Sequence, residues 1–267
     1  MFFKKLFVFI KRDFNVMFTY KSALVFNYLD MFMNLIIFFI FARMFGERML
    51  KSLEGYGGDV ISFVVLGSMG WSLLWNTMGS ATGAIQQEMK AGTFETLFLT
   101  PTSPFTIVSA YTMWDLLINM VSIFLFLITS MFLFEIHFKA NYIFTILFVI
   151  LDIFLMAGLG LMVAGLDVYV KQVGGIVSVV QRLSYFLSGV IFPISVLPTI
   201  LQPIAKIIPF YYAITALRSS LTGNEFATLF PYLIILSILA SVSISLGIYI
   251  FKKGINRARM DGSLAYY

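Results

Sequence analysis

A long run without any charged side chain spans Pro231–Phe251 and reads PYLIILSILASVSISLGIYIF. A helix needs about 20 apolar residues to cross roughly 30 Å of hydrocarbon, and this run has that length and composition. A second run, Ile176–Leu197, carries one charge. Of all 267 residues, 60% are hydrophobic and 12% are charged, which is more apolar surface than a soluble fold of this size could bury. The sequence therefore predicts an all-α, polytopic membrane protein.

Six segments have the composition of a span, and we expect six transmembrane helices within residues 23–251. They are Ala23–Phe41, Val60–Ser80, Phe105–Phe134, Tyr142–Gly165, Ile176–Leu197 and Pro231–Phe251. Six spans place both termini on one side of the membrane. That side would hold twelve of the 18 basic residues, so the positive-inside rule predicts that both termini are cytoplasmic. We expect a multi-pass protein of the cell membrane with a basic cytoplasmic tail, residues 252–267.

The N-terminal segment, residues 1–22, has the pattern of an amphipathic helix. On a helical wheel Lys4, Lys5, Lys11 and Arg12 share one face, and large apolar side chains fall mostly on the other. This pattern is typical of a helix that lies in the cytoplasmic interface of the membrane. The segment could serve for anchoring and topology alone, or it could also dock a cytoplasmic partner.

The segment 198–230 is apolar but is interrupted by Pro198, Pro203 and Pro209. Each proline removes a backbone donor, so no stretch is left that could span as one helix. An apolar, proline-broken segment between two spans predicts external re-entrant short helices, packed against protein at the outer leaflet. The alternative is a plain amphipathic external loop.

The longest expected internal loop, residues 81–104, contains the stretch QQEMKAGTFETLFLTPTSP from position 86. Gly92 is suited to end one helix in the left-handed conformation. Thr93 is then an N-cap candidate for a short helix over Phe94–Leu99, which Pro101 would stop. A short helix parallel to the membrane could receive force from a soluble motor. A simple interfacial turn would show the same capping and the same apolar face.

Two blocks of this sequence resemble the type-2 ABC transporter permeases. Between the expected second and third spans the family shows an acidic residue, then Gly-Thr-Leu/Phe-Glu, a Leu and a Thr-Pro. The matching residues here are Glu88, Gly92-Thr93-Phe94-Glu95, Leu97 and Thr100-Pro101. The second block lies between the expected fifth and sixth spans. It comprises Phe192-Pro193, Leu197-Pro198, Ile208-Pro209-Phe210-Tyr211, Ala216-Leu217-Arg218 and Gly223. The Gly-Thr-Phe-Glu form looks most like the drug-resistance branch.

The resemblance implies roles for particular residues. Glu88, Gly92, Thr93, Phe94 and Glu95 would form a coupling helix region that contacts a nucleotide-binding subunit. The basic residues Lys4, Lys5, Lys11 and Arg12 would flank the same contact. The external helices, with Pro198, Pro203, Pro209, Tyr211 and Arg218, would cap the translocation path. The family works as two permease subunits, a second copy or a homologous chain, on two ATPase subunits. It would export a hydrophobic or amphipathic substrate from the cytoplasm or the inner leaflet.

Several function classes lack the residues that they need. The sequence contains no Gly-x4-Gly-Lys-Ser/Thr loop, so ATP and Mg²⁺ are expected on a separate subunit and this chain is not expected to be an enzyme. It has no cysteine and one histidine, His137, which excludes thiolate and multi-histidine metal sites and leaves no expected cofactor. We expect the lipid bilayer, and no nucleic acid, as a partner. The alternative function is a stand-alone secondary transporter or channel, which would predict an inverted repeat.

Four charged residues fall within the expected spans: Asp30, Asp115, Asp152 and Arg182. Charge inside a membrane is costly and usually faces a partner or a watery cavity. We expect Arg182 to pair with Asp115 or Asp30. The charges could fix helix packing, or they could line the substrate path. Trp71 and Trp75, one turn apart, could likewise serve packing at the interface or line a path for amphiphiles.

Overall fold

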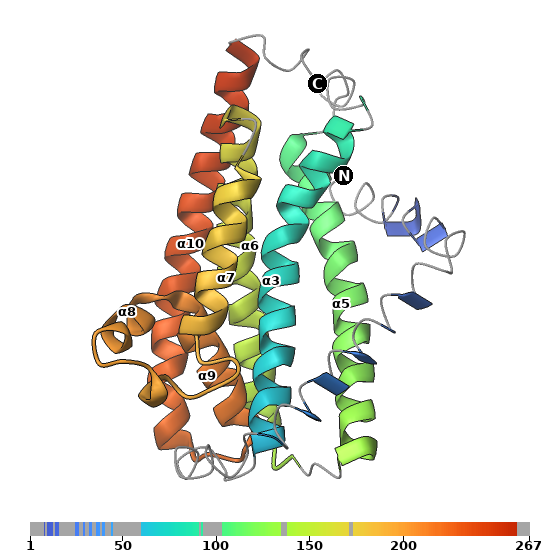
Figure 1. Ribbon diagram of the computed structural model, residues 1–267. Coiled ribbons are helices and arrows are strands. Elements are labelled where there is room, and N and C mark those ends of the chain that lie inside the picture. The colour runs from blue at the N-terminus through green and yellow to red at the C-terminus, as the bar shows by residue number, and fades with distance from the viewer. Residues whose placement is uncertain are drawn as a thin grey trace.

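The computed structural model describes residues 60–90, 92, 103–134, 138–170 and 173–260, together with single positions between 8 and 44. Its long helices stand side by side as a bundle (Figure 1). The elements among the described residues are all helical, and none is a strand. The prediction of an all-α protein is therefore confirmed for this part of the chain.

Among the described residues, four helices are long and apolar enough to cross a membrane. They are α3 (Val60–Lys90), α5 (Pro104–Phe134), α6 (Tyr142–Val170) and α10 (Phe226–Met260). These helices correspond to the second, third, fourth and sixth predicted spans. About half of the first predicted span, Ala23–Phe41, lies outside the described residues.

Two of these helices run further than predicted. Helix α3 continues ten residues past Ser80 to Lys90, so the expected loop 81–104 begins as helix. The added turns contain good helix formers such as Gln86 and Glu88. Gly92 then takes a φ of 68°, as predicted, and its N–H donates to the Met89 carbonyl at 3.1 Å. Helix α10 similarly continues to Met260, so the first part of the expected tail 252–267 is helical.

The fifth predicted span, Ile176–Leu197, is wrong as one continuous helix. Helix α7 covers Gly174–Leu187, which is 14 residues and about 21 Å of helix. Gly189 follows with a φ of 74°, a conformation that ends a helix, and Pro193 has no N–H to continue one. A short 3₁₀ helix, η2 (Ile194–Val196), comes next.

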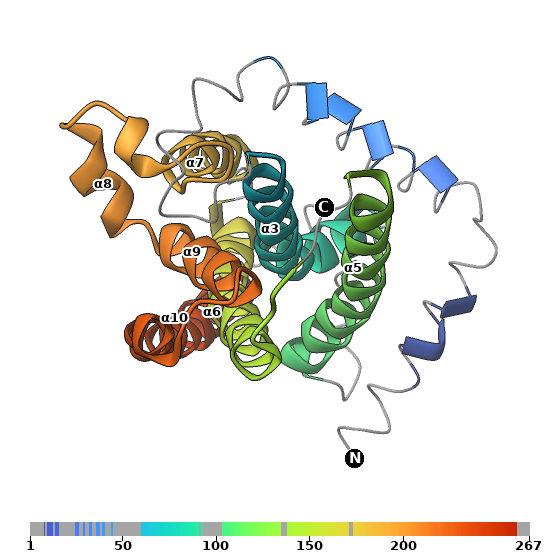
Figure 2. The same ribbon diagram turned by 90° about the horizontal axis from the view of Figure 1, so that it is seen from below.

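Two short helices occupy the proline-broken segment: α8 (Leu201–Ile207) and α9 (Pro209–Leu221). Pro203 lies in the first turn of α8, and Pro209 is the first residue of α9, where its missing N–H costs nothing. Ten residues of α9 are buried, whereas α8 lies at the edge of the bundle (Figure 2). Whether these helices are re-entrant in a membrane stays a prediction.

Helices α3, α6 and α10 touch through their backbones. A Cβ atom added at Gly247 on α10 would collide with the Gly158 carbonyl oxygen on α6. One added at Gly160 would collide with the Met78 carbonyl oxygen on α3. Small residues allow this close approach, and packing of this kind is what drives association where lipid is the solvent. The three helices therefore form one closely packed block.

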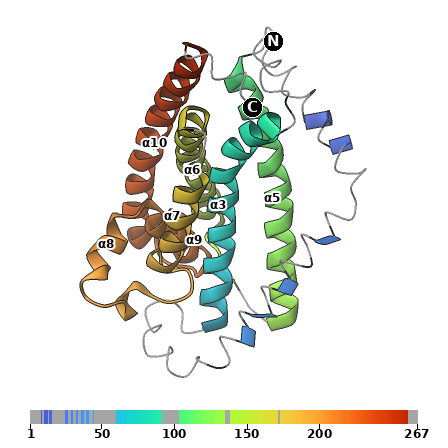
Figure 3. The same cartoon turned by 45° about the horizontal axis from the view of Figure 1, so that its top comes forward.

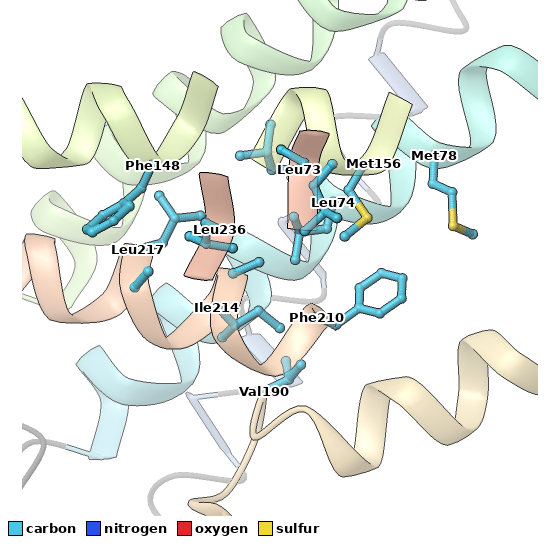
Figure 4. Packing of buried hydrophobic residues seen from close by; sticks show 14 of the residues in the cluster. Leu73, Leu74, Met78, Phe148, Met156, Val190, Phe210, Ile214, Leu217 and Leu236 are labelled. Atoms are coloured by element: carbon cyan, nitrogen blue, oxygen red, sulfur yellow. The ribbon is translucent and has the colours of Figure 1, made fainter. Parts of the chain in front are cut away.

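An apolar cluster joins α9 to this block (Figure 4). Leu73 and Leu74 come from α3, Phe148 and Met156 from α6, Ile214 and Leu217 from α9, and Leu236 from α10. All seven side chains are at most 1% exposed. The cluster fixes α9 within the bundle, although α9 is only 13 residues long.

Helices α3, α6 and α10 run in the same direction (Figure 3). Along α6, Gly158 meets Ser243 and Gly165 meets Phe251, so the partner residue on α10 advances with α6. Met78 at Gly160 and Gln86 at Asp167 show the same for α3. The chain must therefore return along the bundle between α3 and α6, and again between α6 and α10. Helix α5 makes the first return.

Substitution of Gly158 by alanine tests the close packing of α6 on α10. The added Cβ would lie 2.5 Å from the Ser243 carbonyl carbon, so we expect a lower melting temperature and a loss of about 1–3 kcal/mol. Gly79→Ala is the matched control, because nothing lies within 4 Å of its Cβ and alanine favours a helix. Thermal unfolding of the detergent-solubilised variants would measure both. Equal melting temperatures for the two variants would contradict the packing.

Candidate functional site

The coupling stretch begins at the Lys90 end of α3, where α3 is tied to α5 and to the N-terminal segment. The Tyr111 hydroxyl of α5 donates a hydrogen bond to the Glu88 carboxylate at 2.5 Å. The Arg12 guanidinium lies 4.8 Å from the centre of the Tyr111 ring, a cation–π distance. Phe14 contacts Trp114 with ring centres 6.1 Å apart. The structure thus brings Glu88 and Arg12 onto one tyrosine.

The remaining coupling residues are described only in part. Gly92, Lys11 and Arg12 are exposed, with Lys11 and Arg12 in helical conformation. Lys4, Lys5, Thr93, Phe94 and Glu95 lie outside the described residues. The contact of these residues with a nucleotide-binding subunit stays a prediction. Sequence reasoning did not find Tyr111, because no residue near it in the sequence distinguishes it from an ordinary interface tyrosine.

A second polar contact at the Lys90 end involves residues that sequence reasoning did not single out as functional. Asp167, in the last turn of α6, is 5% exposed. One carboxylate oxygen accepts a hydrogen bond from the Gln86 side chain of α3 at 2.9 Å. The other oxygen accepts one from the backbone N–H of Val173, just before α7, at 3.3 Å. An aspartate shortly before a Gly-Gly pair, Gly174-Gly175, is the signal that could have indicated this cap.

Arg218 holds three segments together at the Val60 end. It lies on α9 and is 3% exposed. One guanidinium nitrogen donates to the carbonyls of Phe63, Gly189 and Val190, at 3.2, 3.0 and 3.2 Å. The guanidinium also lies 3.6 Å from the centre of the Phe63 ring. We call this group of contacts the Arg218 anchor. It joins α9, the start of α3 and the turn after α7.

The other residues predicted for the external gate are less buried. Pro198 and Pro203 are exposed, and Pro209 is half-buried at the start of α9. Tyr211 packs on Tyr212 with ring centres 5.1 Å apart. Arg218 makes three side-chain hydrogen bonds to backbone carbonyls, and gating by any residue of this group stays a prediction.

The predicted ion pair of Arg182 does not form with Asp115 in this chain. Arg182 is exposed on α7 and Asp115 is exposed on α5, and α3 stands between these helices (Figure 2). Asp30 lies outside the described residues. Asp152 of α6 is fully buried, and neither carboxylate oxygen has a hydrogen-bond partner among the described residues. Whether these charges serve packing or line a path stays untested.

An aromatic group connects α3 with α7 and α9. Trp71 stacks on Trp75 with ring centres 5.9 Å apart. Trp71 also meets the Tyr185 ring of α7 edge-on at 5.1 Å and the Phe210 ring of α9 at 5.4 Å. Trp71 and Tyr185 are only partly buried. The contact between Trp71 and Tyr185 joins the middle of α3 to α7.

Replacement of Arg218 by methionine would test the Arg218 anchor. Methionine keeps the apolar stem but leaves the buried Gly189 and Val190 carbonyls without their donor, at a cost of about 1–3 kcal/mol each. We expect a clearly lower melting temperature of the purified protein. The control is Lys206→Met, because Lys206 is an exposed cation on α8. Equal unfolding of Arg218→Met and the parent chain would show that the anchor contributes nothing.

The described residues contain no group of three or more His, Cys, Asp or Glu side chains that could hold a metal ion. His137 lies outside them. Residues 4–222 match the family described as ABC-2 type transporter. No curated protein matches the chain significantly.

Proposed function

Because the chain belongs to the ABC-2 type transporter family, we propose that it is the membrane-spanning permease subunit of an ATP-driven exporter. The family match is the observation that carries this proposal. The matched residues, 4–222, include the coupling stretch, the Asp167 contacts and all of α9. The proposal accounts for a chain that has a coupling motif and four long apolar helices but no phosphate-binding loop.

ATP hydrolysis takes place on partner subunits under this proposal. Two ATPase subunits would bind ATP and Mg²⁺ and contact two permease subunits, either two copies of this chain or one copy and a homologue. Gly92, Lys11 and Arg12 are exposed and would lie on this chain's side of the contact. Tyr111 contacts both Glu88 and Arg12, so the N-terminal segment and the coupling stretch would move together.

Six crossings of the membrane fit the contacts of the described residues. Arg12 and Phe14 contact α5 near its start, at Tyr111 and Trp114. Phe39 stacks on Phe134, the last residue of α5, with ring centres 4.9 Å apart. Tyr111 and Phe134 are separated by about 34 Å of helix. The chain therefore passes from one end of α5 to the other between Phe14 and Phe39, which supports a first crossing.

The fifth crossing would combine α7 with the turn that follows it. Helices α6 and α10 run in the same direction, so residues 171–225 must lead from the Lys90 end of the bundle back to the Val60 end. Helix α7 supplies about 21 Å of that path. Both termini would then lie at the Lys90 end, and the charge distribution supports a cytoplasmic location for that end.

The cargo proposed for this permease is hydrophobic or amphipathic, as in the drug-resistance branch. The aromatic contact of Trp71 with Tyr185 supports this, because both rings are partly exposed between α3 and α7. Aromatic rings bury much apolar surface and also attract cations. A flat apolar or cationic amphiphile would meet both properties there.

Co-purification and ATP hydrolysis would test this function. We expect the tagged chain to purify with an ATPase subunit and to hydrolyse ATP only in that complex. Gly92→Val should lower subunit binding or ATP hydrolysis several-fold, because a β-branched residue resists the φ of 68°. Gly83→Val is the matched control: both glycines have open space around them, but Gly83 is helical.

A stand-alone transporter would give a different result. If the purified chain alone moves solute down an ion gradient in liposomes and binds no ATPase subunit, it is a stand-alone transporter and this proposal is wrong.

A further inference from the structure

Of the described helices, α7 has the smallest fraction of buried residues. Ser184 is its one buried residue, whereas α9, of nearly equal length, has ten. Ile176, Val179, Leu183 and Phe186 are all more than half exposed. Apolar burial within this chain therefore does little to fix the position of α7.

Polar contacts hold the two ends of α7 instead. At its start the Asp167 carboxylate accepts the Val173 N–H, which satisfies a donor at the beginning of the helix and places negative charge at its positive end. At its far end the Arg218 anchor binds the carbonyls of Gly189 and Val190. These carbonyls lie just past the C-terminal end of α7, where the helix dipole favours a nearby cation.

Both of these contacts also include α3. Gln86, near the Lys90 end, donates to Asp167, and the Phe63 carbonyl, near the Val60 end, accepts from Arg218. Helix α3 leads within a few residues from Gln86 to Gly92 and the coupling stretch. A displacement of the Lys90 end of α3 would therefore be transmitted to the start of α7 through Gln86 and Asp167.

The far end of α7 is held in place by buried contacts. Arg218 is buried within α9, which is fixed by the apolar cluster. Gly67 of α3 lies so close to this turn that an added Cβ would collide with the Val190 carbonyl oxygen. Gly189, with its φ of 74°, separates α7 from the held carbonyls. This end has the features of a pivot.

We propose that Asp167 is a positioning residue that makes α7 follow the coupling end of α3, while the turn at Gly189 and Val190 serves as the pivot. Helix α7 then swings about the Arg218 anchor when the Lys90 end of α3 moves. The swing changes how the middle of α7 lies against α3, where Tyr185 meets Trp71. The proposal rests on the proposed function, because the movement originates in a bound ATPase.

A fluorescent probe on α7 would report this movement. The chain has no cysteine, so Gln181→Cys gives a single site for bimane, a dye that tryptophan quenches on contact. Gln181 lies one turn before Tyr185, and Trp75 lies one turn after Trp71 on the antiparallel α3, so the dye should sit beside Trp75. Trp75→Phe removes that quencher and measures how much of the quenching is due to Trp75.

The experiment uses the complex with its ATPase subunits in lipid nanodiscs, with and without a non-hydrolysable ATP analogue. We expect the analogue to change bimane fluorescence in the parent complex. Asp167→Ala and Gln86→Ala should reduce this change at least several-fold while the complex still hydrolyses ATP. Asp167→Asn should retain most of it, because the amide oxygen still accepts from Val173 and the amide group can pair with a rotated Gln86. Gln87→Ala, at an exposed neighbouring position, should leave it unchanged.

A second readout does not depend on the partner. Amide hydrogen exchange of the isolated chain should be about tenfold faster at Val173–Val177 in Asp167→Ala than in the parent. Unchanged exchange, or an unreduced fluorescence response in both Asp167→Ala and Gln86→Ala, overturns the proposal. If no ATPase subunit binds the parent chain, the proposed function fails, and the exchange result still decides whether Asp167 holds α7.

Discussion

Backbone contact between α3, α6 and α10 is the constraint on which the other parts of this structure depend. In lipid the helices gain little from hiding apolar side chains, so close approach through small residues supplies the attraction. Gly158 and Gly247 let α6 and α10 meet, and Gly160 lets α6 meet α3. The block gives α9 a surface to pack on, and α3 carries α5 on its other side (Figure 2). Helix α7 is the exception, since hydrogen bonds at its ends hold it.

This division suggests how a push at one end could act through the molecule. The closely packed helices would move together, because backbone contacts leave no room for sliding. Polar contacts can reorganise with less cost, and they lie where α7 meets the block. Tyr111 adds the N-terminal segment to the same end through Glu88 and Arg12. The chain thus combines a stiff body, one loosely packed helix and a coupling end that reaches both.

Much of the fold followed from composition. Apolar runs of sufficient length, each with at most one charged residue, predicted the four long helices, and the conformational freedom of Gly92 predicted the end of α3. The exact ends of helices did not follow. The polar residues after Ser80 suggested a loop, although their helix propensity carries α3 to Lys90. The apolar run up to Leu197 suggested a full span, although the turn at Gly189 ends α7 early.

The candidate site was less predictable, because its contacts join residues far apart in the chain. Glu88 and Arg218 were found through a resemblance, but their partners were not. Arg218 binds the backbone carbonyls of Phe63 and Val190. Every residue has a backbone carbonyl, so the sequence does not show which ones a side chain will bind. The predicted pairing of Arg182 with Asp115 assumed that similar depth means proximity. Helix α3 stands between α5 and α7, the helices that carry these residues, and only the arrangement in space could show this.

The central claim is that the stretch after Lys90 is a cytoplasmic lever worked by a separate ATPase. A cysteine placed at Thr93 in this cysteine-free chain would test it with a membrane-impermeant maleimide. The account predicts no labelling in intact cells, full labelling in opened membranes, and protection once the ATPase subunit is bound. Labelling from outside intact cells, or equal labelling with and without that subunit, would contradict it.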